Sequence, residues 1–385
     1  MSLITREIQL DEEKVVNSFL EWAKVNAPSG KEKSISERLE STLTDMGFSI
    51  QFDEAHINFD GDVGNLIAFW NGTDSSIPPL FFSTHMDTVL PTEDLKPVIK
   101  DGVIYSDGTT ILGADDRAAL TAYLEAIQYV QENNIPCGPI ELILTVNEQQ
   151  ALQGSRHLDY SKVKSDFGYV FDSSGDVGQI ILQGPYSSKF HIEVIGKSSH
   201  IGLNPEEGIY AFEIAADIIK SVKVGKIDEE TLVNVGLIHG GELSSIIPGN
   251  VKMTGEVRCF NKKELNEQLE LIFSNALSAA EKYGGRVRNE IEKKYSGFQV
   301  DKDSLLAKNA FDAAEQIQVQ PWLTKTLGGA DTNNLNENNL TCITLGNGFR
   351  NIHTHQEHIS IKNLVNTVRY TVSLIQSWHN LHKND

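Results

Sequence analysis

Short apolar runs alternate with helical patterns along the first 180 residues. Apolar residues at helical spacing predict one helix beginning near Asp11, a second ending at Gly47 and a third following Ala114. Four runs are short, apolar and bounded by turn residues, as strands buried on both faces tend to be: NLIAFW (65–70), PLFFST (79–84), IELILTV (140–146) and GYVFD (168–172). The order strand, helix, strand predicts an α/β fold, with a mainly parallel sheet and helices on both faces.

Near residue 184 the pattern changes from continuous apolar runs to alternation. The order of elements over 184–296 reads β-α-β-β-α-β, which predicts an inserted α+β domain of ferredoxin-like type. The α/β character then resumes, with a helix at about 303–317, a strand at 340–346 and a last helix at about 361–381. We therefore expect one domain built from residues 1–183 and 297–385, and a second from 184–296.

Composition and charge exclude several classes of partner. The 385 residues carry 53 acids and 33 bases, and the net charge of -20 would repel phosphate backbones, so we expect no nucleic-acid partner. The absence of any apolar run of about 18 residues predicts no membrane span. The first residues lack the basic and apolar blocks of a secretory signal, and the three cysteines are widely spaced with no CxxC pair. We expect a cytoplasmic location.

Polar side chains gather where the predicted strands end. In an open parallel sheet, ligands bind outside the carboxyl ends of the strands. Taken singly, each of these residues has an ordinary structural explanation as a cap, a turn residue or a solvated side chain, but their repetition at one sheet edge favours a site. They are His85 and Asp87, Glu148 and Gln149, Asp172, His353, and the adjacent acids Asp115 and Asp116 at the start of a helix.

These residue types suit a divalent metal. Imidazole and carboxylate hold zinc, manganese or cobalt, and one carboxylate can bridge two ions about 3.5 to 4 Å apart. In the triplet His85-Met86-Asp87, residues two apart on an extended stretch point to the same side, so a carboxylate can orient the imidazole. A general base must then reach the metal-activated water, and Glu148 is the strand-end acid left without another role.

Eight segments together resemble the M20 metallopeptidases, and most closely their peptidase T-like (tripeptide aminopeptidase) branch. The similarity covers nearly the whole chain in order and spacing, and PSGKE (28–32) also resembles the family's N-terminal loop. The segments are STHMDTV (83–89), LGADDRAAL (112–120), TVNEQQALQGSRHLD (145–159), YVFDSSGDVG (169–178), GKSSHIGLNPEEG (196–208), HGGELSSIIP (239–248), GGADTNN (328–334) and NIHTHQE (351–357).

The resemblance implies a zinc-peptidase-like catalytic domain with one or two zinc ions, cobalt and manganese being alternatives. One ion would be held by His85, Asp115 and Asp172. A second would share Asp115 and take its other ligands from the positions of His353 and Gln149. The resemblance also implies that Asp87 orients His85, that Glu148 is the general base, and that the peptide bond joining Asp115 to Asp116 is cis.

For the inserted domain, the resemblance implies a lid that also forms a homodimer. His200 corresponds to a lid histidine that stabilises the substrate carbonyl, and Arg258 to an arginine that binds a substrate carboxylate, a task suited to the guanidinium fork. A solvated loop histidine and a strand-surface salt bridge are the structural alternatives for these two residues.

Two positions depart from the family pattern. Gln149 stands where the family usually has Glu or Asp, and Ser245 stands where it usually has Asn. An amide offers one neutral oxygen, whereas hard divalent cations favour charged oxygens, so we expect a weak or unfilled second metal site. The resulting hypothesis is a metal-dependent aminopeptidase that hydrolyses short peptides. The alternatives are a catalytically impaired binding protein of the same fold and an amino-acid deacylase.

Overall fold

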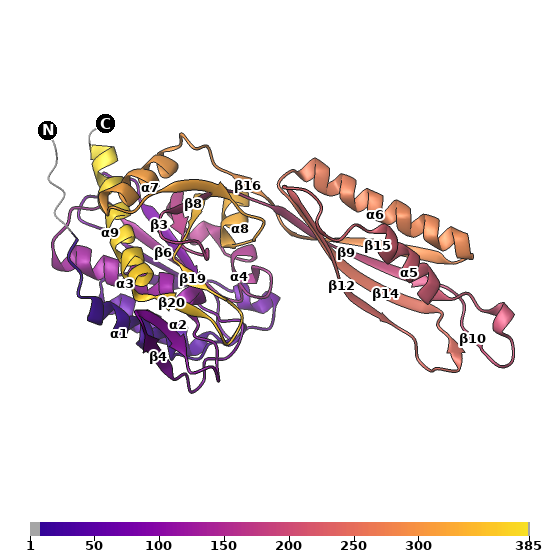
Figure 1. The fold of residues 1–385 in the computed structure, drawn as a ribbon. Helices are drawn as coiled ribbons and strands as arrows, with labels where there is room; N and C mark the ends of the chain where they lie inside the picture. The colour runs from indigo at the N-terminus through magenta and orange to yellow at the C-terminus, as the bar shows by residue number, and fades with distance from the viewer. Residues whose placement is uncertain (1–7, 384–385) are drawn as a thin grey trace. The chain divides into compact units, whose positions relative to one another are not determined.

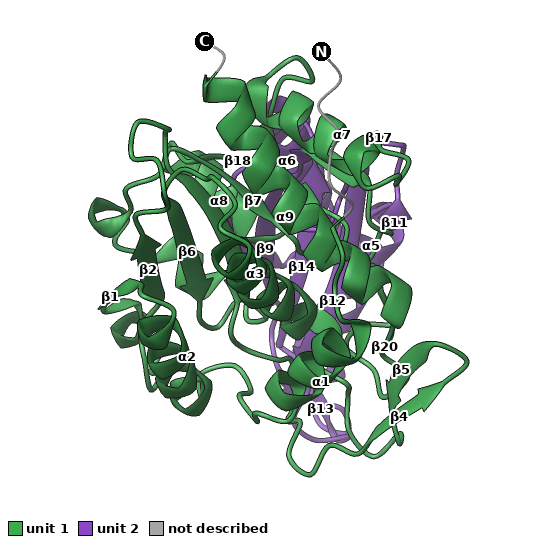
Figure 2. Cartoon of the chain, turned by 90° about the vertical axis from the view of Figure 1, so that its left-hand side faces the viewer, with its two compact units in different colours: residues 1–182, 299–325, 330–385 green, residues 183–298, 326–329 purple. Residues whose placement is uncertain are grey.

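The computed structural model describes residues 8–383, and Figure 1 shows the order of the elements along the chain. The chain forms two compact units, which are coloured separately in Figure 2. Unit 1 comprises residues 1–182, 299–325 and 330–385, and unit 2 comprises residues 183–298 and 326–329. None of the helices in the described part of the chain is long and apolar enough to cross a bilayer.

The main sheet of unit 1 has nine strands. Its order is β1-β2-β6-β3-β7-β18-β8-β16, with β17 paired to β8. The strands are β1 (Ser49–Phe52), β2 (Leu66–Trp70), β3 (Leu80–His85), β6 (Ile140–Thr145), β7 (Phe167–Val170), β8 (Gln179–Gly184), β16 (Phe298–Gln299), β17 (Trp322–Lys325) and β18 (Thr341–Leu345). The four central strands β6, β3, β7 and β18 run parallel. The pairs β1·β2, β2·β6 and β18·β8 run antiparallel, so the expected parallel sheet is found at the centre only.

Helices cover both faces of this sheet. They are α1 (Glu12–Ala23), α2 (Lys33–Asp45), α3 (Ala114–Glu132), α4 (Gln153–Arg156), α7 (Leu305–Gln316), α8 (Asp331–Glu337) and α9 (Ile361–Lys383), with 3-10 turns η1 (Ala55–Asn58) and η2 (Tyr160–Lys162). Successive residues of β3 show the two faces. The ring of Phe82 lies 5.2 Å from that of Tyr123 in α3, whereas Phe81 packs in a buried cluster with Leu335 of α8. Successive side chains of the strand point to opposite faces of the sheet, so each face packs against its own layer of helices.

Unit 1 also contains an antiparallel sheet that the sequence patterns did not predict. It is ordered β19-β20-β5-β4 and consists of β4 (Pro97–Lys100), β5 (Val103–Ser106), β19 (Phe349–Arg350) and β20 (His358–Ser360). The sheet joins segments about 250 residues apart in the chain, and it fixes both ends of the turn that carries His353.

Unit 2 is a five-stranded antiparallel sheet with two helices. The order is β11-β12-β14-β9-β15, formed by β9 (Tyr186–Ile195), β11 (Gly225–Lys226), β12 (Thr231–Gly240), β14 (Asn250–Cys259) and β15 (Arg286–Tyr295). A second small sheet pairs β10 (Ser199–His200) with β13 (Ile246–Ile247) beside the 3-10 turn η3 (Pro205–Glu207). Helices α5 (Ala211–Ser221) and α6 (Lys262–Tyr283) share one buried apolar cluster with alternate residues of the strands, including Phe190, Ile192 and Val194 of β9.

Candidate active site

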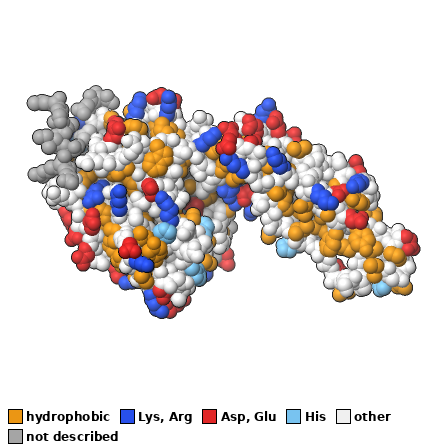
Figure 3. All heavy atoms as spheres, in the orientation of Figure 1, with side chains coloured by type: hydrophobic (Ala, Val, Ile, Leu, Met, Phe, Trp, Pro, Cys, Tyr) orange, Lys and Arg blue, Asp and Glu red, His pale blue; other side chains and the backbone are white. Residues whose placement is uncertain are grey.

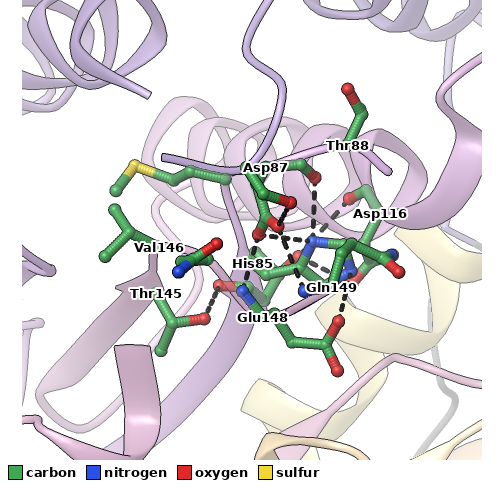
Figure 4. Close-up of polar contacts among 12 residues, drawn as sticks. His85, Asp87, Thr88, Asp116, Thr145, Val146, Glu148 and Gln149 are labelled. Carbon is green, nitrogen blue, oxygen red and sulfur yellow. Dashed lines mark hydrogen bonds and ion pairs between the residues drawn. The ribbon is translucent and has the colours of Figure 1, made fainter. Parts of the chain in front are cut away.

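The carboxyl ends of the central parallel strands carry the polar residues of the candidate site. His85 is the last residue of β3, Glu148 and Gln149 follow β6, and Asp172 follows β7. Because β6, β3 and β7 are neighbouring parallel strands, these residues meet at one edge of the sheet. Figure 4 shows His85, Asp87, Glu148 and Gln149 gathered in this cluster.

Asp115 occupies the centre of the cluster, and its two carboxylate oxygens face different partners. Oδ1 lies 3.1 Å from Nε2 of His85. Oδ2 lies 3.1 Å from Nε2 of His353 and accepts a hydrogen bond of 2.9 Å from the Gln149 amide. One carboxylate thus serves two sides of the site, which is the arrangement of a bridging ligand.

The side that contains His85 fits a divalent cation. One ligand atom from each of His85, Asp115 and Asp172 lies within 4.8 Å of the others, and no other group of this kind was found among the described residues. One imidazole and two carboxylates form a donor set that zinc accepts. Burial, followed by the charge of Asp115, raises the pKa of Asp172 to about 7, and a bound cation would favour the ionised form of this carboxylate.

The side that contains His353 and Gln149 fits a cation less well. The Gln149 side chain directs an N–H toward Asp115, and an N–H cannot act as a ligand. His353 keeps 46% of its side chain exposed and has a left-handed backbone with φ of 64°. A second ion at this position would have one fewer charged oxygen than at the first.

Glu148 lies beside the first side without belonging to its ligand group. Its Oε2 is 3.9 Å from Nε2 of His85, and its side chain is buried. Burial raises the pKa of Glu148 well above its usual value; the charge of His85 opposes this shift, while those of Asp172 and Asp331 add to it. A carboxylate with a raised pKa next to the ligand group is suited to accept a proton.

Asp87 is fully buried, and it contacts both the His85 ring and the backbone amides of Glu148 and Gln149. Nδ1 of His85 lies 2.9 Å from the Asp87 main-chain oxygen and 3.4 Å from its Oδ1. The Asp87 carboxylate accepts hydrogen bonds from Ser29 Oγ (2.6 Å), Glu148 N (3.0 Å) and Gln149 N (3.1 Å). Burial alone would lower the pKa of His85, but the hydrogen bonds with Asp115 and Asp87 raise it well above its ordinary value.

The segment that carries Asp115 is fixed by a second buried acid, Glu357. Its carboxylate accepts hydrogen bonds from Gly113 N (2.7 Å) and Asp115 N (2.9 Å). The peptide bond between Asp115 and Asp116 is cis, as the resemblance implied. The Asp116 carboxylate accepts hydrogen bonds from Thr84 and Asn347.

His200 and Arg258 both lie in unit 2. His200 is an exposed residue of β10 whose Nδ1 accepts a hydrogen bond of 3.1 Å from Gly202 N. Arg258, in β14, donates through Nε to Glu256 at 2.7 Å and through an Nη to the Leu327 carbonyl at 3.1 Å.

Several residues around the site had no role in the sequence analysis. Glu357 and Asp331 stood inside recognised motifs, but no pattern showed that their carboxylates are buried among backbone amides or hydroxyls. Asp331 accepts hydrogen bonds of 2.5 Å from both Thr145 and Ser155, which bracket the segment that contains Glu148. The PSGKE segment likewise brings Ser29 and Glu32 into contact with residues of the site.

Comparisons with known proteins found relatives that match most of this chain. Residues 81–377 match the description "Peptidase family M20/M25/M40". The chain is 35% identical over 367 residues to the uncharacterized protein YqjE of Bacillus subtilis, covering 95% of this chain and 99% of that protein. A crystal structure of aminopeptidase PepT from Bacillus cereus is 35% identical with a TM-score of 0.89, and a tripeptidase from Staphylococcus aureus is 33% identical with a TM-score of 0.93. Each of these two structural matches covers 96% of this chain and 99% of the other.

Proposed function

Because the chain belongs to peptidase family M20/M25/M40, a family of hydrolytic enzymes, we propose that it is a metal-dependent aminopeptidase acting on short peptides, tripeptides in particular. The observation that carries the proposal is the position of Glu148 beside the ligand group His85, Asp115 and Asp172. The similarity to an aminopeptidase and a tripeptidase, each over nearly the whole chain, supports the substrate class.

His85, Asp115 and Asp172 would hold the cation, with zinc as the first choice and cobalt or manganese as alternatives. A bound divalent cation supplies Lewis-acid chemistry, polarising the scissile carbonyl and lowering the pKa of water. The neighbouring carboxylates and the His85 imidazole match such a cation in charge and in donor type.

Glu148 takes the proton of the attacking water in this proposal. The water oxygen forms a bond to the scissile carbonyl carbon, and the carbon–nitrogen bond then breaks. Glu148 returns the proton to the leaving amine, so the carboxylate is regenerated within one turnover. Asp87 contributes by fixing the backbone of Glu148, since Glu148 N donates to its carboxylate at 3.0 Å.

In unit 2, we assign substrate contacts to His200 and Arg258. The Glu256 carboxylate and the Leu327 carbonyl fix the guanidinium of Arg258 from two directions. A guanidinium held in this way is suited to bind the terminal carboxylate of a short peptide. The exposed His200 ring is available to hydrogen-bond a substrate carbonyl.

We also propose a homodimer formed through unit 2, which acts as the lid. β11 pairs only with Leu232 and Val233, so the rest of β12 has no strand partner on that side among the described residues. Leu237 and Ile238 of this segment are 54% and 50% exposed, and Figure 3 shows hydrophobic side chains on the surface of unit 2 near β12. An exposed apolar strand edge is stabilised when it pairs with another strand.

The hydrogen bond from Gln149 to Asp115 favours one alternative, a binding protein with impaired catalysis. If the amide holds Asp115 in place of a second cation, hydrolysis depends on the first site alone. A deacylase that removes acyl groups from amino acids is the other alternative, because one fold serves several substrates.

The experiment compares wild-type protein with Glu148→Gln on a panel of tri-alanine, di-alanine, tetra-alanine and an N-acetyl amino acid. We expect chelator to abolish release of the N-terminal residue from the tripeptide, and added zinc to restore it. Glu148→Gln should lower kcat by about 10²–10⁴-fold while the protein retains its metal. Gln150→Ala, at an exposed neighbour, is the control and should behave like wild type.

No hydrolysis with zinc, cobalt or manganese would support the binding protein and overturn the peptidase. Cleavage of the acylated amino acid alone would establish the deacylase. Full activity in Glu148→Gln would remove Glu148 as the base.

A further inference from the structure

The segment that carries Glu148 is held by side chains from outside its own strand. Four consecutive backbone N–H groups, from Val146 to Gln149, each donate to a side-chain oxygen. Their acceptors are Asn65 Oδ1 at 3.0 Å, Glu32 Oε1 at 2.9 Å, Asp87 Oδ1 at 3.0 Å and Asp87 Oδ2 at 3.1 Å. The direction of the Glu148 side chain therefore depends on these acceptors.

The backbone of this segment needs such support. Asn147, Ala151 and Leu152 have φ angles of 51°, 73° and 59°, in the left-handed region that L-residues seldom adopt. Non-glycine residues stay in this region when surrounding contacts over-determine them. Asn147 directly precedes Glu148, so a change in the backbone dihedral angles of Asn147 would turn the Glu148 side chain away from His85.

Glu32 is the anchor of Asn147. It stands at the start of α2 but makes no capping hydrogen bond to that helix, and it is 0% exposed. Its Oε1 accepts hydrogen bonds from Gly30 N (2.8 Å) and Asn147 N (2.9 Å), while its Oε2 has no hydrogen-bond partner within residues 8–383. Burying a carboxyl group is unfavourable. The long-range hydrogen bond of Glu32 is to Asn147 N, and its charge also interacts with those of Asp87 and Arg117.

Glu32 acts as a hydrogen-bond acceptor for two backbone amides. Burial, and then the neighbouring Asp87 charge, raise the pKa of Glu32 to about 7. A glutamine side chain has the same length and keeps one acceptor oxygen. An aspartate side chain keeps the charge but is one methylene shorter.

We propose that Glu32 is a positioning residue, which fixes the backbone of Asn147 and thereby directs Glu148 toward the reacting centre. This inference rests on the hydrolysis proposed above only for its kinetic readout. The hydrogen bonds that Glu32 accepts come from Gly30 N and Asn147 N, and the second of these leads directly to the backbone that carries Glu148.

Glu141 supplies a matched control. It is also a glutamate with 0% exposure, and it also accepts hydrogen bonds from backbone amides, those of Lys164 (3.0 Å) and Ser165 (2.8 Å). It lies near the start of β6, whereas the segment with Glu148 follows the end of the same strand. Loss of either carboxyl should destabilise unit 1, but only loss of Glu32 should disturb Glu148.

The experiment measures tripeptide kinetics, metal content and amide hydrogen exchange in Glu32→Ala, Glu32→Gln, Glu32→Asp and Glu141→Ala. We expect Glu32→Ala to lower kcat on the order of 10²-fold, the scale of a small misplacement, with KM and metal content unchanged. Exchange in a peptide spanning 145–152 should become faster in this variant. Glu32→Gln should resemble wild type, Glu32→Asp should resemble Glu32→Ala, and Glu141→Ala should keep its kcat and its protection at 145–152.

Wild-type kcat and unchanged exchange at 145–152 in Glu32→Ala would overturn the proposal, as would equal losses of kcat in Glu32→Ala and Glu141→Ala. Low activity in Glu32→Gln with full activity in Glu32→Asp would show that charge matters instead of the hydrogen bond. If Glu32→Ala does not fold, the comparison of kcat and hydrogen exchange between Glu32→Asp and Glu32→Gln tests the proposal in its place. If wild-type protein cleaves no peptide, the proposed function fails, while the exchange comparison still decides whether Glu32 positions this segment.

Discussion

At the scale of single residues, the site depends on which atom each side chain directs at Asp115. His85 and His353 face opposite oxygens, and Gln149 directs an N–H at one of them. A carboxylate at position 149 would repel Asp115 unless a cation lay between them. The residue at position 149 thus decides how well the second side of the site can hold an ion.

Gln149→Glu should therefore strengthen the second metal site. We expect zinc to bind there about 10- to 100-fold more tightly than in wild type, the range associated with gain or loss of one supporting group. Calorimetric titration of chelated protein measures both sites, with Gln150→Glu as the control for added surface charge. An unchanged isotherm in Gln149→Glu would show that this position does not limit the second site.

The sequence could predict the site residues that follow strands, but not the buried acids that accept hydrogen bonds from backbone amides of the site. His85, Glu148 and Asp172 were predicted because each lies at the end of a short apolar run or within two residues of it. Glu32 and Glu357 were not predicted, because their hydrogen-bond partners are distant in the sequence. Glu32 binds the backbone of a residue 115 positions away, and Glu357 binds that of a residue 242 positions away. Such long-range contacts leave no local pattern of hydrophobic and polar positions.

At the scale of elements, long helices and buried strands were predictable and short edge strands were not. The pattern placed α3, β6 and α9 within a few residues of their bounds. It did not predict the sheet of β19, β20, β5 and β4, since two- to four-residue strands contain too few positions to show a period. The short helix α8 (Asp331–Glu337) was not predicted either, because seven residues span only about two helical turns.

One helix of unit 2 offers a direct test of a local cap. Asn261 precedes α6 and accepts hydrogen bonds from Lys263 N (2.8 Å) and Glu264 N (3.4 Å). Asn261→Ala should lower the free energy of unfolding of unit 2 by about 1 kcal/mol. Urea-dependent hydrogen exchange of α6 peptides measures this change, with Lys262→Ala, at an exposed position, as the control. Equal stability of the two variants would contradict the assigned cap.

At the scale of the whole molecule, the proposed dimer predicts a solution mass near twice the 42.6 kDa of one chain. Leu237→Glu combined with Ile238→Glu should halve that mass, because it adds four negative charges per dimer along an edge proposed to pair with itself. Light scattering measures both states. Ile57→Glu, at an exposed apolar residue of unit 1, is the matched control and should leave the mass unchanged. A wild-type mass near 42.6 kDa would contradict the dimer.

The central claim is that one divalent cation is held by His85, Asp115 and Asp172, next to the base Glu148, with a weaker second side at His353 and Gln149. Anomalous scattering at the zinc absorption edge, from crystals grown with zinc, tests this claim most directly. We predict one strong peak contacting His85, Asp115 and Asp172, and a weak peak or none beside His353. Absence of a peak at His85, or two equal peaks with the Gln149 amide oxygen as a ligand, would contradict the account.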